Sequence, residues 1–262
     1  MYKIIAETAF SHEGDFNYLL SQIEEASKAK VDYVKFQVFI DLDQYIVPKH
    51  PSYDILKNWI FSKLQWKSAF KMAKEKGLKV LALPLNVSSL ELCISLDYMV
   101  DIYEIHPVCF HDIHLINLFK KVNKKILIGV GGALINEVKK LISVIEKSKD
   151  KVILMHGFQS FPTDANKLNL GKIKTFKDNF QCEIGYADHS GYADEKYKDL
   201  NSFAFFLGAT YFEKHIVLEK GKNRIDYETA LVSPDFIEMR DSLDVTVGVF
   251  GNQSGSYLND KE

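Results

Sequence analysis

Polar side chains stand at the ends of several apolar segments, where buried charge is costly unless it is used. The first segment ends in Glu7, and the second contains Lys35 and Gln37. Two late segments lead to His189 and His215. Residues two apart in a strand share a face, so Lys35 and Gln37 are expected to point the same way. A carboxylate, an amine and two imidazoles gathered in one place would suit metal-assisted acid–base chemistry.

The two histidines are the strongest sign of chemistry. If their strands are neighbours, and if Glu7 lies on the next strand, they suit a divalent cation with open positions for substrate. The alternative is that His189 and His215 are hydrogen-bonded structural residues. Asp188 is expected either to orient a histidine or to cap its own loop, and the sequence favours neither.

Lys35 must meet an anion if it is buried. A substrate carboxylate or phosphate would serve, and so would a structural ion pair with Glu7 or Glu213. Asp226 follows the last predicted strand and either reaches over the site or is an ordinary loop acid. The histidines after the fourth strand are expected to pack or to face solvent: His106, His111 and His114.

Eight short apolar segments alternate with helical ones. The predicted strands are 4–7, 33–39, 79–84, 99–105, 125–129, 151–156, 183–187 and 209–214. Helices are expected between them, beginning at 16–30 with Asp15 as cap and ending at 233–249. Right-handed crossovers repeated in this way predict a closed (β/α)8 TIM barrel of the α/β class. Polar strand ends, His156 included, would then lie at its carboxyl-terminal face.

Length and composition agree with one such domain. The chain has 262 residues and a net charge of −2, and a barrel of this kind needs about 250 residues. We expect the barrel over residues 1–250 and a polar tail over 251–262. A doubly wound open sheet is the alternative, but no glycine-rich phosphate loop follows the first strand.

Charge and cysteine usage narrow the partners and the compartment. The near-neutral charge predicts neither nucleic-acid nor membrane binding. Three scattered cysteines, without a CxxC motif or a leader segment, predict a cytoplasmic protein. The expected partners are small molecules.

Several motifs together resemble the sialic acid (N-acetylneuraminate) synthase family. In order they are Ile4-Ile5-Ala6-Glu7, Ser11-His12-Glu13-Gly14-Asp15, Val34-Lys35-Phe36-Gln37, Gly185-Tyr186-Ala187-Asp188-His189 and Glu213-Lys214-His215. The resemblance runs from residue 4 to about 250. It implies a metal-dependent barrel that condenses phosphoenolpyruvate with an amino sugar aldehyde, and a homodimer is possible.

The resemblance also implies roles for individual residues. His189 and His215 would hold Mn²⁺ or Mg²⁺, and Glu7 would act on water as a general base. Lys35 would hold phosphoenolpyruvate, and Asp226 would contact the sugar. The remaining substrate contacts are expected from Gln37, Gln159 and Gly131, the last through a backbone nest at 129–132.

The chain departs from the family where phosphate is bound. The family has hydroxyl, amide or lysine side chains at positions that here are Leu83, Glu104, Pro107, Gly129, Gln159, Phe161 and Ala187. Glu104 in place of a lysine would repel a phosphate, and each lost charge-assisted bond would weaken binding by roughly 1.5–3 kcal/mol. We expect no counterpart of the family's antifreeze-like domain after residue 250. Closure of the site is therefore expected from the 40–60 connection or from another subunit.

Three functions follow from these observations. The first is a divergent synthase that uses phosphoenolpyruvate, recognised by phosphate release. The second is a metal-dependent aldolase or lyase that uses pyruvate or another unphosphorylated donor. The third is a non-catalytic sugar-binding barrel, which a wide separation of His189 from His215 would favour.

Overall fold

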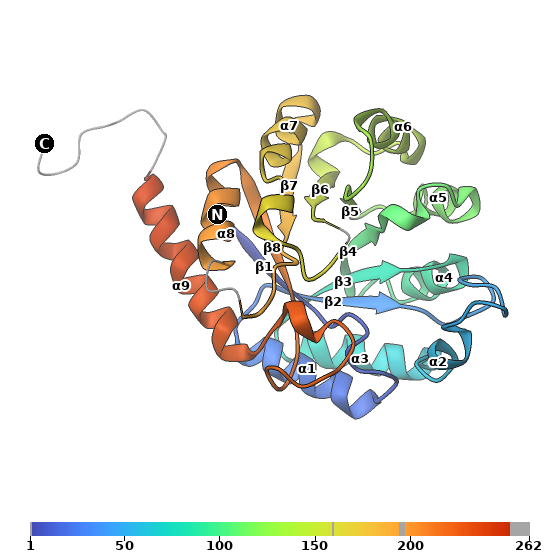
Figure 1. Ribbon diagram of the computed structural model, residues 1–262. Helices are drawn as coiled ribbons and strands as arrows, with labels where there is room; N and C mark the ends of the chain where they lie inside the picture. Colours follow the sequence, from blue (N-terminus) through green and yellow to red (C-terminus); the bar gives the residue numbers. More distant parts are fainter. Residues whose placement is uncertain (1, 159, 194–196, 252–262) are drawn as a thin grey trace, which may run out of the picture.

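Eight parallel strands close into a barrel in the computed structural model, which describes residues 2–158, 160–193 and 197–251 (Figure 1). They are β1 (Lys3–Glu7), β2 (Tyr33–Val38), β3 (Lys79–Pro84), β4 (Val100–Ile105), β5 (Lys125–Gly129), β6 (Val152–His156), β7 (Glu183–Ala187) and β8 (Ala209–Ile216). A short β9 (Ala230–Leu231) continues beside β8. β1 pairs in continuous parallel register with β8, from Lys3 opposite Tyr211 to Glu7 opposite His215. The predicted TIM barrel is confirmed, and an open sheet is excluded because both edges of the sheet meet.

Helices surround the barrel in the order that the sequence predicts. They are α1 (Phe16–Lys28), α2 (Tyr53–Lys57), α3 (Lys63–Glu75), α4 (Val87–Ser95), α5 (Ile113–Phe119), α6 (Ile135–Ile145), α7 (Gly171–Phe180), α8 (Tyr197–Phe206) and α9 (Ser233–Phe250). Single 3-10 turns add η1 (Pro107–Cys109), η2 (Lys149–Lys151), η3 (Ala165–Lys167) and η4 (Tyr227–Thr229). Asp15 caps α1 as expected, because its side chain accepts the backbone N–H groups of Asn17 and Tyr18. None of the helices in the described ranges has the length and apolarity needed to span a bilayer.

Alternation along the strands separates two buried layers. Outward residues form the large core between barrel and helices, with Trp66 of α3 and Phe70 packed on Phe36. Inward residues fill the lower barrel with an apolar plug: Ile5, Tyr33, Leu81, Ile102, Leu127, Ile153, Met155, Ala187 and Tyr211. Residues two positions further along β1, β2 and β4 lie above this plug, at the carboxyl-terminal ends of the strands.

The 40–60 connection folds onto a small cluster of its own. Phe39, Leu42, Leu83 and Leu85 form the buried part of this cluster, and the connection contributes half-buried aromatic and aliphatic side chains such as Tyr45 and Tyr53. Leu83 is fully buried here. The side chains of the connection thus pack beside the barrel, and none of them lines the cavity described next.

Candidate active site

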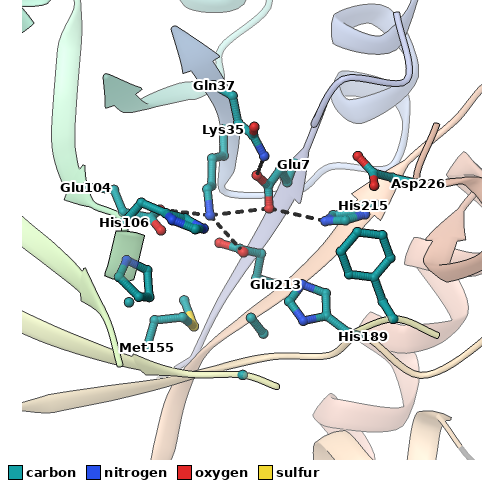
Figure 2. A pocket seen from close by; sticks show the side chains of 15 residues that line it. Glu7, Lys35, Gln37, Glu104, His106, Met155, His189, Glu213, His215 and Asp226 are labelled. Atoms are coloured by element: carbon teal, nitrogen blue, oxygen red, sulfur yellow. Dashed lines mark hydrogen bonds and ion pairs between the residues drawn. The ribbon is translucent and has the colours of Figure 1, made fainter. Parts of the chain in front are cut away.

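A cavity opens at the carboxyl-terminal ends of the strands, above the apolar plug (Figure 2). Its volume is ≈ 90 Å³, enough for several waters or a small ligand. The lining residues are Glu7, Lys35, Gln37, Glu104, His106, Pro107, Gly129, Met155, Gly157, Phe161, Ala187, His189, Glu213, His215 and Asp226. Side chains from β1, β2, β4 and β8 and from the loops after β4, β6, β7 and β8 therefore meet in one place.

Lys35 lies at the centre of three buried glutamates (Figure 2). Its Nζ is 2.8 Å from Glu104 Oε2, 2.9 Å from Glu213 Oε1 and 3.3 Å from Glu7 Oε2. All four side chains are 3–4% exposed. The lysine expected to need an anion thus has three, including the two glutamates that the sequence offered as partners.

One lysine cannot neutralise three carboxylates, so the acids differ in charge. Burial opposes ionisation of Glu7, but Lys35 and His215 outweigh it and hold the pKa of Glu7 well below its usual value. Burial raises the pKa of Glu104 to about 7 against the pull of Lys35. Burial also raises the pKa of Glu213 well above its usual value. Near neutral pH, Glu7 is therefore ionised, whereas burial favours the protonated forms of Glu104 and Glu213.

The two predicted histidines meet at the edge of this cluster. Their ring centroids are 5.3 Å apart. His189 Nδ1 donates to the Phe158 carbonyl at 2.7 Å, which leaves Nε2 as the lone-pair nitrogen. His215 Nδ1 lies 3.1 Å from Thr229 Oγ1, and its Nε2 lies 3.5 Å from Glu7 Oε2. Burial lowers the pKa of His189 to about 4, so this ring is neutral at physiological pH.

The imidazole pair fits a divalent cation. An ion about 2.0–2.1 Å from each ring nitrogen places the two centroids roughly 5 Å apart, close to the observed spacing. The carbonyl of Phe158 fixes the His189 tautomer with Nε2 free, which is the usual arrangement of a metal-ligating histidine. Among the described residues, no three His, Cys, Asp or Glu side chains are arranged to hold a metal ion by themselves. The donor set therefore suits an ion that completes its shell with water or substrate.

Asp226 lines the cavity from the loop between β8 and η4. Its backbone is left-handed, with φ 66°. The motif before α1 anchors this loop: Ile225 N donates to Glu13 Oε1 at 3.0 Å, and Arg224 donates to the Ser11 carbonyl at 3.2 Å. Burial raises the pKa of Asp226. Of its two expected placements, the one over the barrel mouth is the one observed.

Asp188 does not contact either histidine. Its Oδ1 accepts the backbone N–H of Ser190 at 2.9 Å, and its Oδ2 is 3.1 Å from Lys214 Nζ. Lys214 points away from the cavity, as the alternation with Glu213 and His215 predicts, and also donates to the Ser190 carbonyl at 2.8 Å. Of the two roles expected for Asp188, capping its own loop is therefore the one observed. Its contacts shape the turn that carries His189.

The other residues predicted for the site differ in where they lie relative to the cavity. Gln37 donates to Glu7 Oε1 at 2.7 Å and so orients that carboxylate. Gly129 lines the cavity but Gly131, in the turn after β5, does not. Gln159 lies outside the described residues. His156 ends β6 at the carboxyl-terminal face as expected, but its side chain does not enter the cavity: it stacks on Tyr186 and hydrogen-bonds to the Leu168 carbonyl at 2.9 Å, because its strand position faces the helices.

Two titratable lining residues were not predicted from the sequence. Glu104 was treated only as a lost lysine, and His106 as a packing residue. Glu104 stands two positions after the inward Ile102, so the same alternation that selected Lys35 would have selected it. His106 caps η1 by accepting the backbone N–H of Val108 at 3.3 Å, and burial lowers its pKa to about 4.

In the family that the sequence resembles, phosphate is held by polar side chains. Three of the corresponding positions in this cavity carry no polar side chain. Pro107, Gly129 and Ala187 line it without a side-chain donor. A Cβ at Gly129 would lie only 2.8 Å from the Pro107 ring, so Pro107 and a side chain at 129 exclude each other. Leu83 lies in the cluster of the 40–60 connection instead.

Comparisons with known proteins agree on one family. The model of the NeuB family matches residues 22–254. An N,N'-diacetyllegionaminic acid synthase from Campylobacter jejuni is 28% identical over 87% of this chain and 71% of its own length. A pseudaminic acid synthase from the same species is 26% identical over 98% of this chain and 75% of its own. In fold, the chain is similar to an N-acetylneuraminic acid synthetase from Leptospira borgpetersenii, solved with citrate (TM-score 0.88, 24% identity, 99% and 88% covered).

Proposed function

Since this chain belongs to the NeuB family, we propose that it is a condensing enzyme that joins a 2-oxo-acid unit to an amino sugar aldehyde. The product would be a nonulosonic, sialic-type acid of carbohydrate biosynthesis. One observation carries the proposal: Glu7, Lys35, His189, His215 and Asp226 come from distant segments and converge on a single cavity. Relatives named as legionaminic and pseudaminic acid synthases support the reaction class.

His189 and His215 are the residues that would hold Mn²⁺ or Mg²⁺ in this proposal. Such an ion supplies Lewis-acid polarisation of a carbonyl oxygen. Phe158 and Thr229 keep the two rings in place through hydrogen bonds to Nδ1. Asp226, at the rim of the cavity, would orient the sugar hydroxyls.

The chain's own residues divide the remaining tasks. Lys35 binds the carboxylate of the donor and balances charge that forms beside it. Burial raises the pKa of Glu213 and so favours its protonated form, which can donate a hydrogen bond to the same carboxylate. Glu7 stays ionised between Lys35, Gln37 and His215 and is placed to orient a water or a hydroxyl group.

The environment of Lys35 favours an unphosphorylated donor such as pyruvate over phosphoenolpyruvate. Three carboxylates already surround this lysine. A phosphate would bring roughly −1.5 to −2 further charge at pH 7. Pro107, Gly129 and Ala187 offer it no side-chain donor. The carboxylate of pyruvate adds much less negative charge beside Lys35. This supports the second function drawn from the sequence, an aldolase or lyase that uses an unphosphorylated donor.

The test is turnover with each donor. The protein is incubated with Mn²⁺, N-acetylmannosamine or a related amino sugar, and either pyruvate or phosphoenolpyruvate, and products are identified by mass spectrometry. We expect a nine-carbon acid from pyruvate. Release of inorganic phosphate with product from phosphoenolpyruvate would support the family's donor instead. No product from either donor would reject the condensing function. The expected cytoplasmic location and homodimer stay predictions of the sequence.

A further inference from the structure

We propose that Glu104 is the catalytic base of this site: it takes a proton from carbon three of an unphosphorylated 2-oxo acid and returns it to the oxygen of the aldehyde. The inference rests on the proposed function and deepens it. A methyl ketone acid is not a nucleophile until a proton leaves its methyl group. A site that condenses such a donor must therefore contain a base beside the bound methyl group.

Glu104 occupies the right position for that base. It points inward from β4, is 3% exposed and lines the cavity. Its Oε2 lies 2.8 Å from Lys35, which is the group proposed to hold the donor carboxylate. On its other side, a Cβ at Gly129 would stand 3.7 Å from Oε1. The same Cβ would stand only 2.8 Å from the Pro107 ring, so Pro107 fills that side, and the donor methyl group must reach Glu104 from the cavity that both residues line.

The other candidate bases are engaged elsewhere. Glu7 is held ionised by Lys35 and His215 at a pKa well below its usual value, so it is a weak base. Burial raises the pKa of Glu213 well above its usual value, which favours its protonated form. His106 Nδ1 accepts the backbone N–H of Val108, so its Nε2 carries the proton and can only donate. The lone pair of His189 Nε2 is assigned to the cation.

The electrostatics of Glu104 support the same role. Burial raises its pKa to about 7 against the attraction of Lys35. A carboxylate of this basicity exchanges protons near the operating pH much better than an ordinary glutamate. The charged and titratable groups around it are Lys35 from β2, Glu7 from β1, Glu213 from β8, and His106 and Cys109 from the segment after β4.

The step balances without a co-reactant. The C3–H bond of the 2-oxo acid breaks, its proton goes to Glu104, and the electron pair forms the enolate. Carbon three then bonds to the aldehyde carbon. The former carbonyl oxygen of the aldehyde takes the proton from Glu104, which returns to its carboxylate form. No group leaves, and the ammonium of Lys35 stays beside the charge throughout.

Solvent exchange isolates this proton transfer from the rest of the reaction. Pyruvate is incubated with the protein and Mg²⁺ in D₂O without any sugar, and loss of the methyl signal is followed by proton NMR. We expect the parent to catalyse exchange and Glu104→Gln to lose it by roughly 10²- to 10⁴-fold. Glu75→Gln, which removes an exposed glutamate of α3 that does not line the cavity, should exchange at the parent rate. Thermal melting checks that both variants fold.

The outcomes separate this inference from the proposed function. A Glu104→Gln variant that exchanges at the parent rate overturns the role of Glu104 and leaves the condensing function standing. A parent that exchanges no deuterium and makes no product from pyruvate rejects the function as well. The pH profile of the parent gives an independent reading: exchange should rise towards a plateau around pH 7 as Glu104 loses its proton. A rate that does not change between about pH 5 and 9 would contradict a base of this kind.

Discussion

Replacing Lys35 by methionine tests the charge cluster at the centre of the site. The substitution keeps the length of the side chain but removes the ammonium that lies 2.8–3.3 Å from the carboxylates of Glu7, Glu104 and Glu213. Breaking a buried ion pair by removing one partner costs about 3–5 kcal/mol, because charge is left uncompensated. For a chain of this size that corresponds to a fall in Tm of roughly 6–20 °C at pH 8.

The loss of stability caused by Lys35→Met should become smaller as the pH falls. Without Lys35, the pKa values of the buried glutamates in the folded variant rise above those in the unfolded chain. Groups with raised folded pKa values contribute stability at pH below their unfolded pKa, and this contribution is lost as pH rises through the folded pKa. In the parent, Glu7 has a lowered pKa, so the stability that it contributes is present above its unfolded pKa and is lost only as the pH falls through its folded pKa, below the range from pH 5 to pH 8. The raised pKa values in the variant therefore bring the two proteins closer together at pH 5.

Thermal melting of the parent and Lys35→Met at pH 5 and pH 8 measures both effects. Lys174→Met is the matched control, since it removes the exposed ion pair with Asp178 on α7. Exposed ion pairs of this kind contribute only about 0–1 kcal/mol to stability, so the Tm of the control should be close to that of the parent at both pH values. A Lys35→Met protein whose Tm deficit is the same at pH 5 as at pH 8 would refute the reasoning.

Four further variants test the roles of individual side chains. His189→Ala and His215→Ala should each remove bound Mn²⁺ while the fold is kept, because each loses half of the protein donor set. Metal analysis after dialysis checks this, and unchanged metal content would reject both ligands. Glu7→Gln should keep the metal but lose turnover, since the neutral amide no longer matches Lys35 and His215; full activity would refute the role. Asp226→Asn should raise the KM for the sugar more than it lowers kcat, and an unchanged KM would contradict its contact with sugar.

Much of the site follows from the sequence because strand alternation and closure of a barrel are strict geometric rules. Glu7 and His215 end up directly opposite each other on β1 and β8. Lys35 and Glu213 share the inward face with them. A polar residue at an inward position near a strand end can therefore be assigned to the cavity before any coordinates are known.

The errors arose where a residue was judged by type rather than by position. Glu104 was read as a missing lysine, although its spacing from Ile102 points it inward. His156 does end a strand at the carboxyl-terminal face, but its side chain lies on the face of β6 that packs against α7. The loop that carries Asp226 depends on contacts with Glu13 and Ser11 far away in sequence, which no local pattern reveals.

We propose that His189, which follows β7, and His215 on β8 together hold one cation beside the buried glutamates around Lys35. Crystals of the protein soaked in Mn²⁺, with data collected near the manganese absorption edge, test it most directly. We expect one strong anomalous peak within bonding distance of both His189 Nε2 and His215 Nε2. A clear map of both rings with no anomalous peak between them, or with the peak elsewhere in the barrel, would contradict it.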